Sequence, residues 1–181
     1  MEDTLSREQR AFLLDLARRT ISFYLKKGKT LKETTEDPAL LEKRGAFVTL
    51  KVDNNLRGCI GYALPHKSLF QTIVDCAIAA SSQDFRFAPL KKEELPQLNI
   101  EISVLTLPRR VKDVSEIKIG EHGIILSKGP HKGLLLPQVP VEWNWDLETY
   151  LDHGCLKAGL PEREWKKGAT IEIFSAEVFS E

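Results

Sequence analysis

The sequence predicts an α+β fold, with a mainly antiparallel sheet flanked by helices. Strand-like runs occur as neighbouring pairs joined by short polar turns, rather than in strict alternation with helices. Apolar residues recur with a helical period near the N-terminus, near residue 70 and near residue 150. A chain of 181 residues without internal repeats is long enough to bury one substantial core. We therefore expect one domain of the α+β class.

The first helix is expected to begin after Ser6 and to continue to about Leu25. Ser6 and Gln9 have the spacing of a capping box, and Gly28 follows as a C-terminal signal. The next residues, 29–44, are polar and predict a loop with one helical turn.

A β-hairpin is expected over Gly45–Val52 and Leu56–Tyr62. Its connection, Asp53-Asn54-Asn55, suits a tight turn because Asn and Asp tolerate left-handed backbone geometry. The second strand contains the hexapeptide Leu56-Arg57-Gly58-Cys59-Ile60-Gly61, in which two glycines bracket a cysteine. Two interpretations remain open: a site for an anion or electrophile, or a strand with a bulge and a buried cysteine.

A second helix is expected over Leu69–Ser81, with Cys76 on its buried face. The segment after it, residues 84–89, has no periodicity and is expected to dock on the fold. The residues that would hold it are Asp84 and Arg86, as an ion pair, and Phe85 and Phe87, as apolar anchors.

In the second half of the chain, alternating apolar residues predict further strands and a helical period predicts a further helix. Glu101 is expected to face solvent, and Cys155 to pack in the core. In order, these elements are a short helical segment at Lys91–Leu95, a strand at Leu98–Leu107, an extended segment through residues 111–119, a hairpin over His122–Ser127 and Gly133–Leu136, a helix from the cap Asp146 to Ala158, and a strand at Thr170–Phe179.

Composition excludes several classes of protein. The 26 Lys and Arg residues balance 26 Asp and Glu residues, so no global field favours nucleic acid. Three cysteines without a CxxC pair suggest no disulfide framework and a reducing compartment. The acidic N-terminus, residues 1–4, does not resemble a signal peptide, and no apolar run has the length of a membrane span. We expect a cytoplasmic protein that binds neither membranes nor nucleic acid.

Seven blocks in register resemble the AMMECR family, named for the AMME chromosomal region gene 1 protein. The hexapeptide, LRGCIG, is the signature of that family, and the resemblance covers nearly the whole chain. The other blocks are Phe47-Val48-Thr49-Leu50-Lys51, Asp84 with Arg86-Phe87, Glu93-Glu94-Leu95-Pro96, His122-Gly123-Ile124, Leu136-Pro137-Gln138 and Trp145-Asp146.

The resemblance implies one AMMECR-type domain over residues 1–181, with a larger and a smaller lobe around a cleft near the hexapeptide. It implies no established activity and no particular cofactor. Microbial members resemble one component of a gene cluster with a Memo-like protein and a radical S-adenosylmethionine protein, which are therefore candidate partners. Gln138, in one of the matching blocks, is a candidate ligand-binding residue.

One functional hypothesis is an enzyme with Cys59 as the nucleophile. A thiolate is the reactive form of cysteine, and a nearby cation or histidine favours it. His122, beside a glycine at a strand start, is the candidate base, and Asp84 would orient it. Main-chain amides from Gly58 to Gly61 would stabilise an oxyanion.

The alternative hypothesis is a binding or adaptor module without catalysis. Arg57 and Arg86, with the amides of Gly58 and Gly61, would hold an anionic ligand or a carboxylate of a partner. In this case Cys59 only packs. A metal site is not predicted, because His122, Cys59 and a carboxylate lack the spacing typical of metal ligands.

Overall fold

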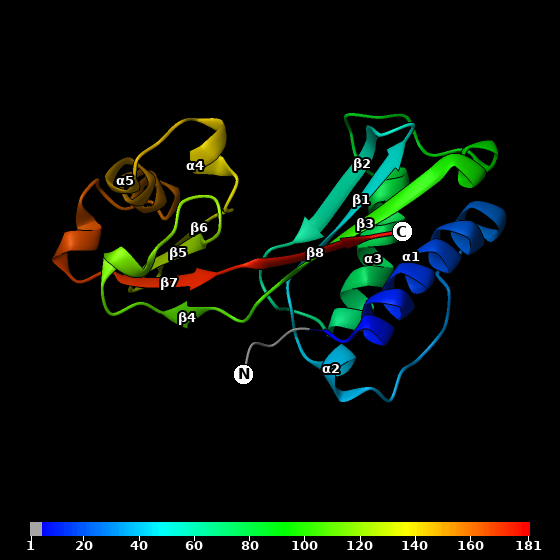
Figure 1. Cartoon of the computed structure of the whole chain (residues 1–181), viewed down its shortest axis with the longest axis horizontal. Coiled ribbons are helices and arrows are strands. Elements are labelled where there is room, and N and C mark those ends of the chain that lie inside the picture. The colour runs from blue at the N-terminus through cyan, green and yellow to red at the C-terminus, as the bar shows by residue number, and fades with distance from the viewer. Residues whose placement is uncertain (1–4) are drawn as a thin grey trace. The chain divides into compact units, whose positions relative to one another are not determined.

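Two four-stranded sheets, one in each of two units, form the framework of this computed structural model, which describes residues 5–181 (Figure 1). The first unit comprises the described residues up to Leu105 together with Glu177–Glu181, and the second comprises Thr106–Ala176. The acidic N-terminal residues 1–4 lie outside the described residues. The expected cleft between two lobes stays a prediction.

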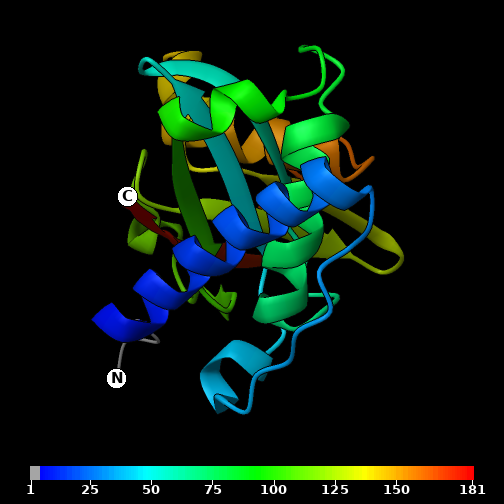
Figure 2. The same ribbon diagram turned by 90° about the vertical axis from the view of Figure 1, so that its right-hand side faces the viewer.

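The sheet of the first unit has the strand order β2-β1-β3-β8. Figure 2 shows the two long helices, α1 and α3, lying across one face of this sheet. The elements of the unit are α1 (Arg7–Lys27), α2 (Pro38–Leu41), β1 (Ala46–Val52), β2 (Asn55–Tyr62), α3 (Leu69–Ser82), the 3-10 helix η1 (Lys92–Gln97), β3 (Leu98–Leu105) and β8 (Ala176–Ser180).

The core of the first unit lies between the helices and one face of the sheet. Along β1, Ala46, Val48 and Leu50 are fully buried, while the residues between them are half-buried. Side chains alternate between the two faces of a strand, so the second set points away from α1 and α3. The sheet therefore has a helix-covered face and a helix-free face.

The second unit packs one helix, α5, against a sheet of order β4-β7-β5-β6. Its core includes Ile124 and Leu126 from β5 and Tyr150, Leu151 and Cys155 from α5. The elements are β4 (Arg109–Arg110), η2 (Val114–Glu116), β5 (Gly123–Lys128), β6 (His131–Leu135), α4 (Val139–Glu142), α5 (Leu147–Lys157), η3 (Glu164–Lys167) and β7 (Thr170–Phe174).

The predicted fold class is confirmed, as are most of the local signals. Ser6 and Gln9 form the capping box of α1, and Gly28 ends that helix in the left-handed conformation. Cys76 and Cys155 are fully buried, as predicted. Among the described residues, no helix combines the length and the apolar character that crossing a membrane requires.

Outside the β1–β2 hairpin, three predictions were wrong. The last strand is divided at Ser175 into β7 and β8, which belong to different sheets. The segment 111–119 contains a 3-10 turn capped by Asp113 instead of an extended strand. Phe85 is 96% exposed and anchors nothing, because the turn that contains it is held by polar contacts of Asp84.

The β1–β2 hairpin contains a β-bulge, as one of the two interpretations of the hexapeptide predicted, although Cys59 is partly exposed and not buried. Its turn has two residues instead of three, Asp53 and Asn54, with φ angles of 50° and 62°. Positive φ at both central positions is the geometry of a type I′ turn. The register then shifts: Lys51 pairs with Leu56, but Leu50 pairs with Gly58. Arg57 is thus the extra residue of a β-bulge.

Gly58 lies against α3 because a side chain would not fit there. A Cβ atom at this position would stand 2.1 Å from the main-chain oxygen of Ala80. That oxygen belongs to the helix backbone and cannot rotate away. Glycine at position 58 therefore sets how closely α3 approaches β2.

We predict that Gly58→Ala lowers the free energy of unfolding by about 1–3 kcal/mol, the usual cost of overpacking a core. Urea denaturation followed by circular dichroism measures the change. Val178→Ala is the control, because Val178 is 56% exposed on β8, the strand at the opposite edge of the same sheet. Equal stability of wild type and Gly58→Ala would show that α3 moves freely relative to β2.

Candidate functional site

The thiol of Cys59 lies on the helix-free face of the first sheet. Cys59 pairs with Thr49 across β1, and Thr49 pairs in turn with Glu101 on β3. Paired residues share a face, so the three side chains form a row across the sheet. Cys59 is partly exposed, whereas Cys76 and Cys155 are buried.

The main chain of Cys59 is held at the edge of the sheet by an ion pair. Its N–H donates to Oδ2 of Asp84 at 2.9 Å, and its carbonyl accepts from Nη2 of Arg86 at 3.3 Å. Asp84 is only 4% exposed and also accepts from Nε and Nη2 of Arg86, at 2.9 and 2.7 Å. The predicted Asp84–Arg86 pair is confirmed, and it occupies the place that a further strand would take.

The Asp84 carboxylate is ionised at neutral pH. Hydrogen bonds from the Arg86 side chain hold the pKa of Asp84 well below its ordinary value, against the opposing effect of burial. The Cys59 amide lowers the pKa further. Both carboxylate oxygens are engaged within the first unit. The predicted role of Asp84 in orienting His122 stays a prediction, and it would require one oxygen to change partner.

The Cys59 sulfur receives a hydrogen bond from a side chain of the same row. Thr49 Oγ1 donates to Sγ at 3.1 Å. Both main-chain groups of Cys59 point away from β1, as at a non-hydrogen-bonded pair, where facing side chains come closest. Beyond Thr49, Lys51 Nζ lies 2.8 Å from Glu101 Oε2. A threonine hydroxyl therefore contacts the thiol, and an ion pair lies beyond it on the same face of the sheet.

Arg57 is engaged in contacts within the first unit. Its Nε and Nη2 donate to the two carboxylate oxygens of Glu94, at 2.7 and 3.1 Å. Nη1 donates to the carbonyl of Ala88, and Nη2 also to that of Pro89. Hydrogen bonding to Arg57 lowers the pKa of Glu94. The predicted ligand-binding role of Arg57 would require these contacts to open.

Gly61 leaves room for an aromatic ring on the same face as Cys59. A Cβ atom at Gly61 would stand 2.2 Å from Cδ1 of Phe47, the residue that pairs with it on β1. The Phe47 ring thus leans over Gly61, one step along the sheet from the row of Cys59. The two glycines of the hexapeptide serve opposite faces: Gly58 admits α3, and Gly61 admits Phe47.

His122 and Gln138 belong to the second unit. The His122 Nδ1 accepts from the main-chain N–H of Lys118 at 3.1 Å, which leaves the proton of a neutral ring on Nε2. Burial and the nearby Arg109 lower the pKa of His122. Gln138 is exposed at the start of α4, where its side chain makes no capping hydrogen bond. The predicted proximity of His122 to Cys59 and the predicted ligand-binding role of Gln138 stay predictions.

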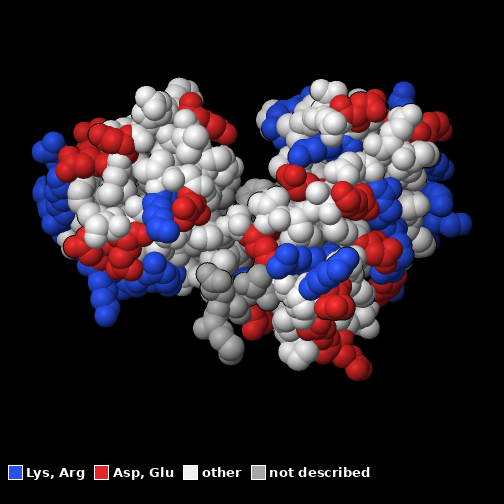
Figure 3. All heavy atoms as spheres, viewed as in Figure 1, with Lys and Arg blue, Asp and Glu red and all other residues white. Residues whose placement is uncertain are grey.

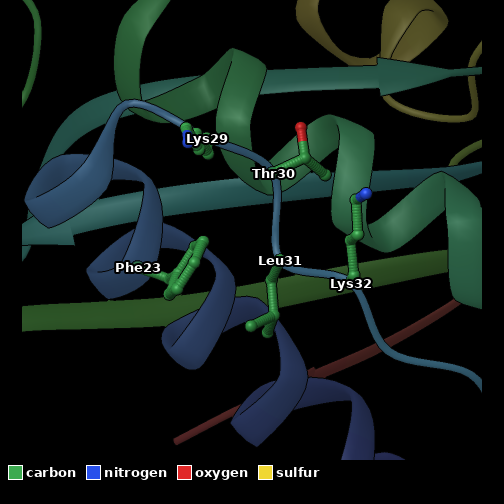
Figure 4. A pocket seen from close by; sticks show the side chains of 5 residues that line it. All are labelled: Phe23, Lys29, Thr30, Leu31 and Lys32. Atoms are coloured by element: carbon green, nitrogen blue, oxygen red, sulfur yellow. The ribbon is translucent and has the colours of Figure 1, made fainter.

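A hollow of about 520 Å³ in the first unit lies apart from all the predicted site residues (Figure 4). It is formed by the end of α1 and the loop that follows it, and it is mostly apolar. Its lining residues are Phe23, Lys29, Thr30, Leu31 and Lys32. The described residues contain no group of three or more His, Cys, Asp or Glu side chains placed to hold a metal ion.

The charges do not form a single-sign surface. On the face seen in Figure 3, Lys and Arg side chains are interspersed with Asp and Glu side chains over each unit. Interspersed charges produce little long-range steering of a polyanion.

Sequence reasoning missed Thr49, Glu101 and Glu94 as neighbours of the hexapeptide. The Thr49–Cys59 contact depends on the bulge: with a regular register after the turn, Thr49 would face Gly58. The glycines of the hexapeptide indicated that a bulge was possible, but they do not show at which residue the register shifts. Glu94 was visible as part of a matching block, but its distance of 37 residues from Arg57 gave no pairing signal.

We predict that Asp84→Asn destabilises the protein at neutral pH and that the difference from wild type shrinks in acid. A carboxyl whose pKa is depressed by folding stabilises the native state above its unfolded pKa of about 3.9, and this contribution is lost as the pH falls below that value. Loss of charge-assisted hydrogen bonds at a buried site costs about 1–3 kcal/mol.

Urea denaturation at a series of pH values between neutrality and the acid limit of folding measures both quantities. Glu93→Gln is the matched control, since Glu93 is an exposed carboxylate on the neighbouring 3-10 helix. A difference that stays constant with pH would contradict a stabilising charge on Asp84.

Comparison with known proteins confirms the resemblance seen in the sequence. The AMMECR1 family matches residues 14–179. The protein MK0488 of Methanopyrus kandleri is 46% identical over 100% of this chain and 92% of its own length. The crystal structure of the uncharacterised protein PH0010 of Pyrococcus horikoshii has a TM-score of 0.71 and 44% identity, and covers 94% of this chain and 90% of that one. These names state no activity. The chain belongs to the AMMECR1 family.

Proposed function

We propose that this protein is an enzyme that acts on a small molecule, or on a group of a partner protein, through the thiol of Cys59. One observation carries the proposal: Cys59 is the partly exposed cysteine, and its main chain is fixed on both sides by Asp84 and Arg86. A buried carboxylate paired with an arginine, together fixing the main chain of one residue of an edge strand, is expected where the position of a side chain matters.

The surroundings of the sulfur support a nucleophilic role. The Thr49 hydroxyl donates to Sγ and would stabilise negative charge on a thiolate. The Lys51 ammonium, two residues along β1 on the same face, would attract an anionic substrate. Sγ of Cys59 would form a bond to a carbonyl carbon while the C=O π electrons move to the oxygen and make it an oxyanion, and the thiol proton would pass to a base.

The hydrogen bond at Nδ1 of His122 does not favour this residue as the base. His122 was predicted for this role, but its Nδ1 is occupied by the Lys118 amide, so the neutral ring presents an N–H at Nε2. In that tautomer Nε2 carries a proton and Nδ1 already accepts a hydrogen bond, so neither nitrogen is free to take the thiol proton. The support for Cys59 is therefore independent of His122.

A second candidate function is a binding or adaptor module, which one feature of Arg86 favours. The Arg86 side chain is 45% exposed, and the hydrogen bonds found among the described residues use its Nε and Nη2 but not its Nη1. An anionic group could therefore bind at Nη1 without breaking the pair with Asp84. The Memo-like and radical S-adenosylmethionine proteins remain proposed partners.

We predict that alkylation of the native protein modifies Cys59 alone. Burial raises the pKa of Cys76 to about 12, and burial also raises the pKa of Cys155, so both thiols should stay unreactive until the protein unfolds. Iodoacetamide labelling followed by intact mass measures the number of modified thiols.

Two variants control this measurement. Cys59→Ser should abolish labelling of the folded chain, and the double variant Cys76→Ser, Cys155→Ser should keep the wild-type profile. A Cys59 thiol that reacts only after unfolding would overturn the enzymatic proposal.

We predict that Cys59→Ser and Arg86→Lys separate the two candidate functions. A thermal-shift screen of anionic metabolites would identify ligands, since a ligand at one hundred times its Kd stabilises the native state by about 2.7 kcal/mol. If the adaptor function holds, Arg86→Lys should lose the stabilisation by the ligand, although a cation remains beside Asp84. Cys59→Ser should retain that stabilisation. If the enzymatic function holds, Cys59→Ser should abolish turnover of the same compounds.

A further inference from the structure

Three aromatic rings form a stack on the surface of the second unit. The rings of Trp145 and His153 are parallel to within 7°, with centroids 3.9 Å apart. Trp143 extends the stack, 6.3 Å from Trp145 at an interplanar angle of 22°. Trp143 is 68% exposed, so the outer ring of the stack is open to solvent.

Main-chain hydrogen bonds define the backbone that carries the two tryptophans. The turn between α4 and α5 is closed by main-chain hydrogen bonds: the N–H of Trp145 donates to the carbonyl of Pro140 at 2.8 Å, and that of Trp143 to Val139 at 3.1 Å. Asn144, between the two tryptophans, is in the left-handed conformation with a φ of 51°. The backbone on both sides of the exposed ring is therefore ordered, so a ligand would not have to order it on binding.

The chain segment that carries the two tryptophans of the stack has charged residues of one sign. Residues 133–156 contain no Lys or Arg, and their acidic residues include Glu142 and Asp146, each next to a tryptophan of the stack. Glu148 pairs with Lys166, and Asp152 accepts from the Trp165 indole and the Arg163 amide. In the described part of the chain, neither Glu142 nor Asp146 forms an ion pair. The Asp146 side chain caps the start of α5. Their charges remain available to a cation.

We propose that this surface, comprising Glu142, Trp143, Trp145, Asp146 and His153, binds an arginine-bearing basic segment of a protein partner. A guanidinium is planar, always charged and weakly hydrated, so it stacks on an indole face while its N–H groups reach a carboxylate. An aromatic face beside unpaired carboxylates matches both properties. A nucleotide fits less well, because its phosphates would be repelled by the same carboxylates. This proposal does not depend on the function of Cys59.

The test uses the full chain and a short peptide of alternating arginine and glycine, titrated by calorimetry at low and at high salt. We expect saturable binding that weakens with salt, that is tighter than binding of the matching lysine peptide, and that is absent with a glutamine peptide. Trp143→Ala should raise the Kd about two- to fivefold, the loss expected for one exposed cation–π contact. Trp143→Phe should restore part of the affinity.

The charge and the specificity have separate controls. Asp146→Asn removes the charge but keeps a good N-cap for α5, and with Glu142→Gln it should raise the Kd and flatten the salt dependence. Phe85→Ala removes an aromatic side chain that is 96% exposed but belongs to the first unit, and it should change nothing.

The proposal is overturned by any of three outcomes: a Kd that Trp143→Ala leaves unchanged, an equal effect of Phe85→Ala, or tighter binding of the uncharged nucleoside adenosine than of the arginine peptide. Unchanged thermal unfolding of Trp143→Ala, which alters an exposed side chain, verifies that the fold is intact.

Discussion

The β-bulge at Arg57 is the constraint on which the arrangement around the hexapeptide depends. Because side chains alternate along a strand, a shift of one residue exchanges the faces of every residue beyond it. With the bulge, Gly58 meets α3 and Cys59 faces away from the helices. In a regular register, Cys59 would pair with Val48 and point into the core. The bulge thus converts a core position into an accessible one.

The bulge and its neighbours stabilise one another. Only glycine at position 58 lets the Ala80 carbonyl approach, which favours the register in which Gly58 faces the helix. Arg57, the extra residue, reaches Glu94 and the carbonyls of the 88–89 segment. Asp84 and Arg86, a few residues earlier in the same loop, form hydrogen bonds with the outward-facing N–H and carbonyl of Cys59. An edge strand is otherwise open to unwanted pairing, and here side chains cover its centre.

Arg57 and Arg86 were both candidate ligand-binding residues, and both form ion pairs within the first unit. Arg57 is committed to Glu94, and Arg86 is committed to Asp84 but retains an exposed edge. The cations therefore act first in positioning the strand and the thiol. In the second unit the situation is reversed, because Glu142 and Asp146 have no cationic partner among the described residues and lie beside an exposed indole. The two units thus offer different chemistry: a positioned thiol in one and an anionic aromatic surface in the other.

Local signals in the sequence determined the elements and their class. The capping box of Ser6 and Gln9, the turn residues Asp53 and Asn54, and the periodic apolar positions of α1, α3 and α5 act over a few residues, so they can be recognised without a fold. They also determined that Cys76 and Cys155 are buried, and that Asp84 pairs with Arg86 two residues away. The family motif indicated where the candidate site lies.

Only the tertiary structure decided the register of β2, the face on which Cys59 lies and the partners that surround it. Each of these depends on contacts between residues far apart in the chain: Gly58 with Ala80, Arg57 with Glu94, and Asp84 with the amide of Cys59. It also decided that one predicted strand serves two sheets, because the break at Ser175 follows from its hydrogen bonds to Thr106. Such choices are made by packing and by pairing of polar groups across the fold, and a linear pattern carries no information on them.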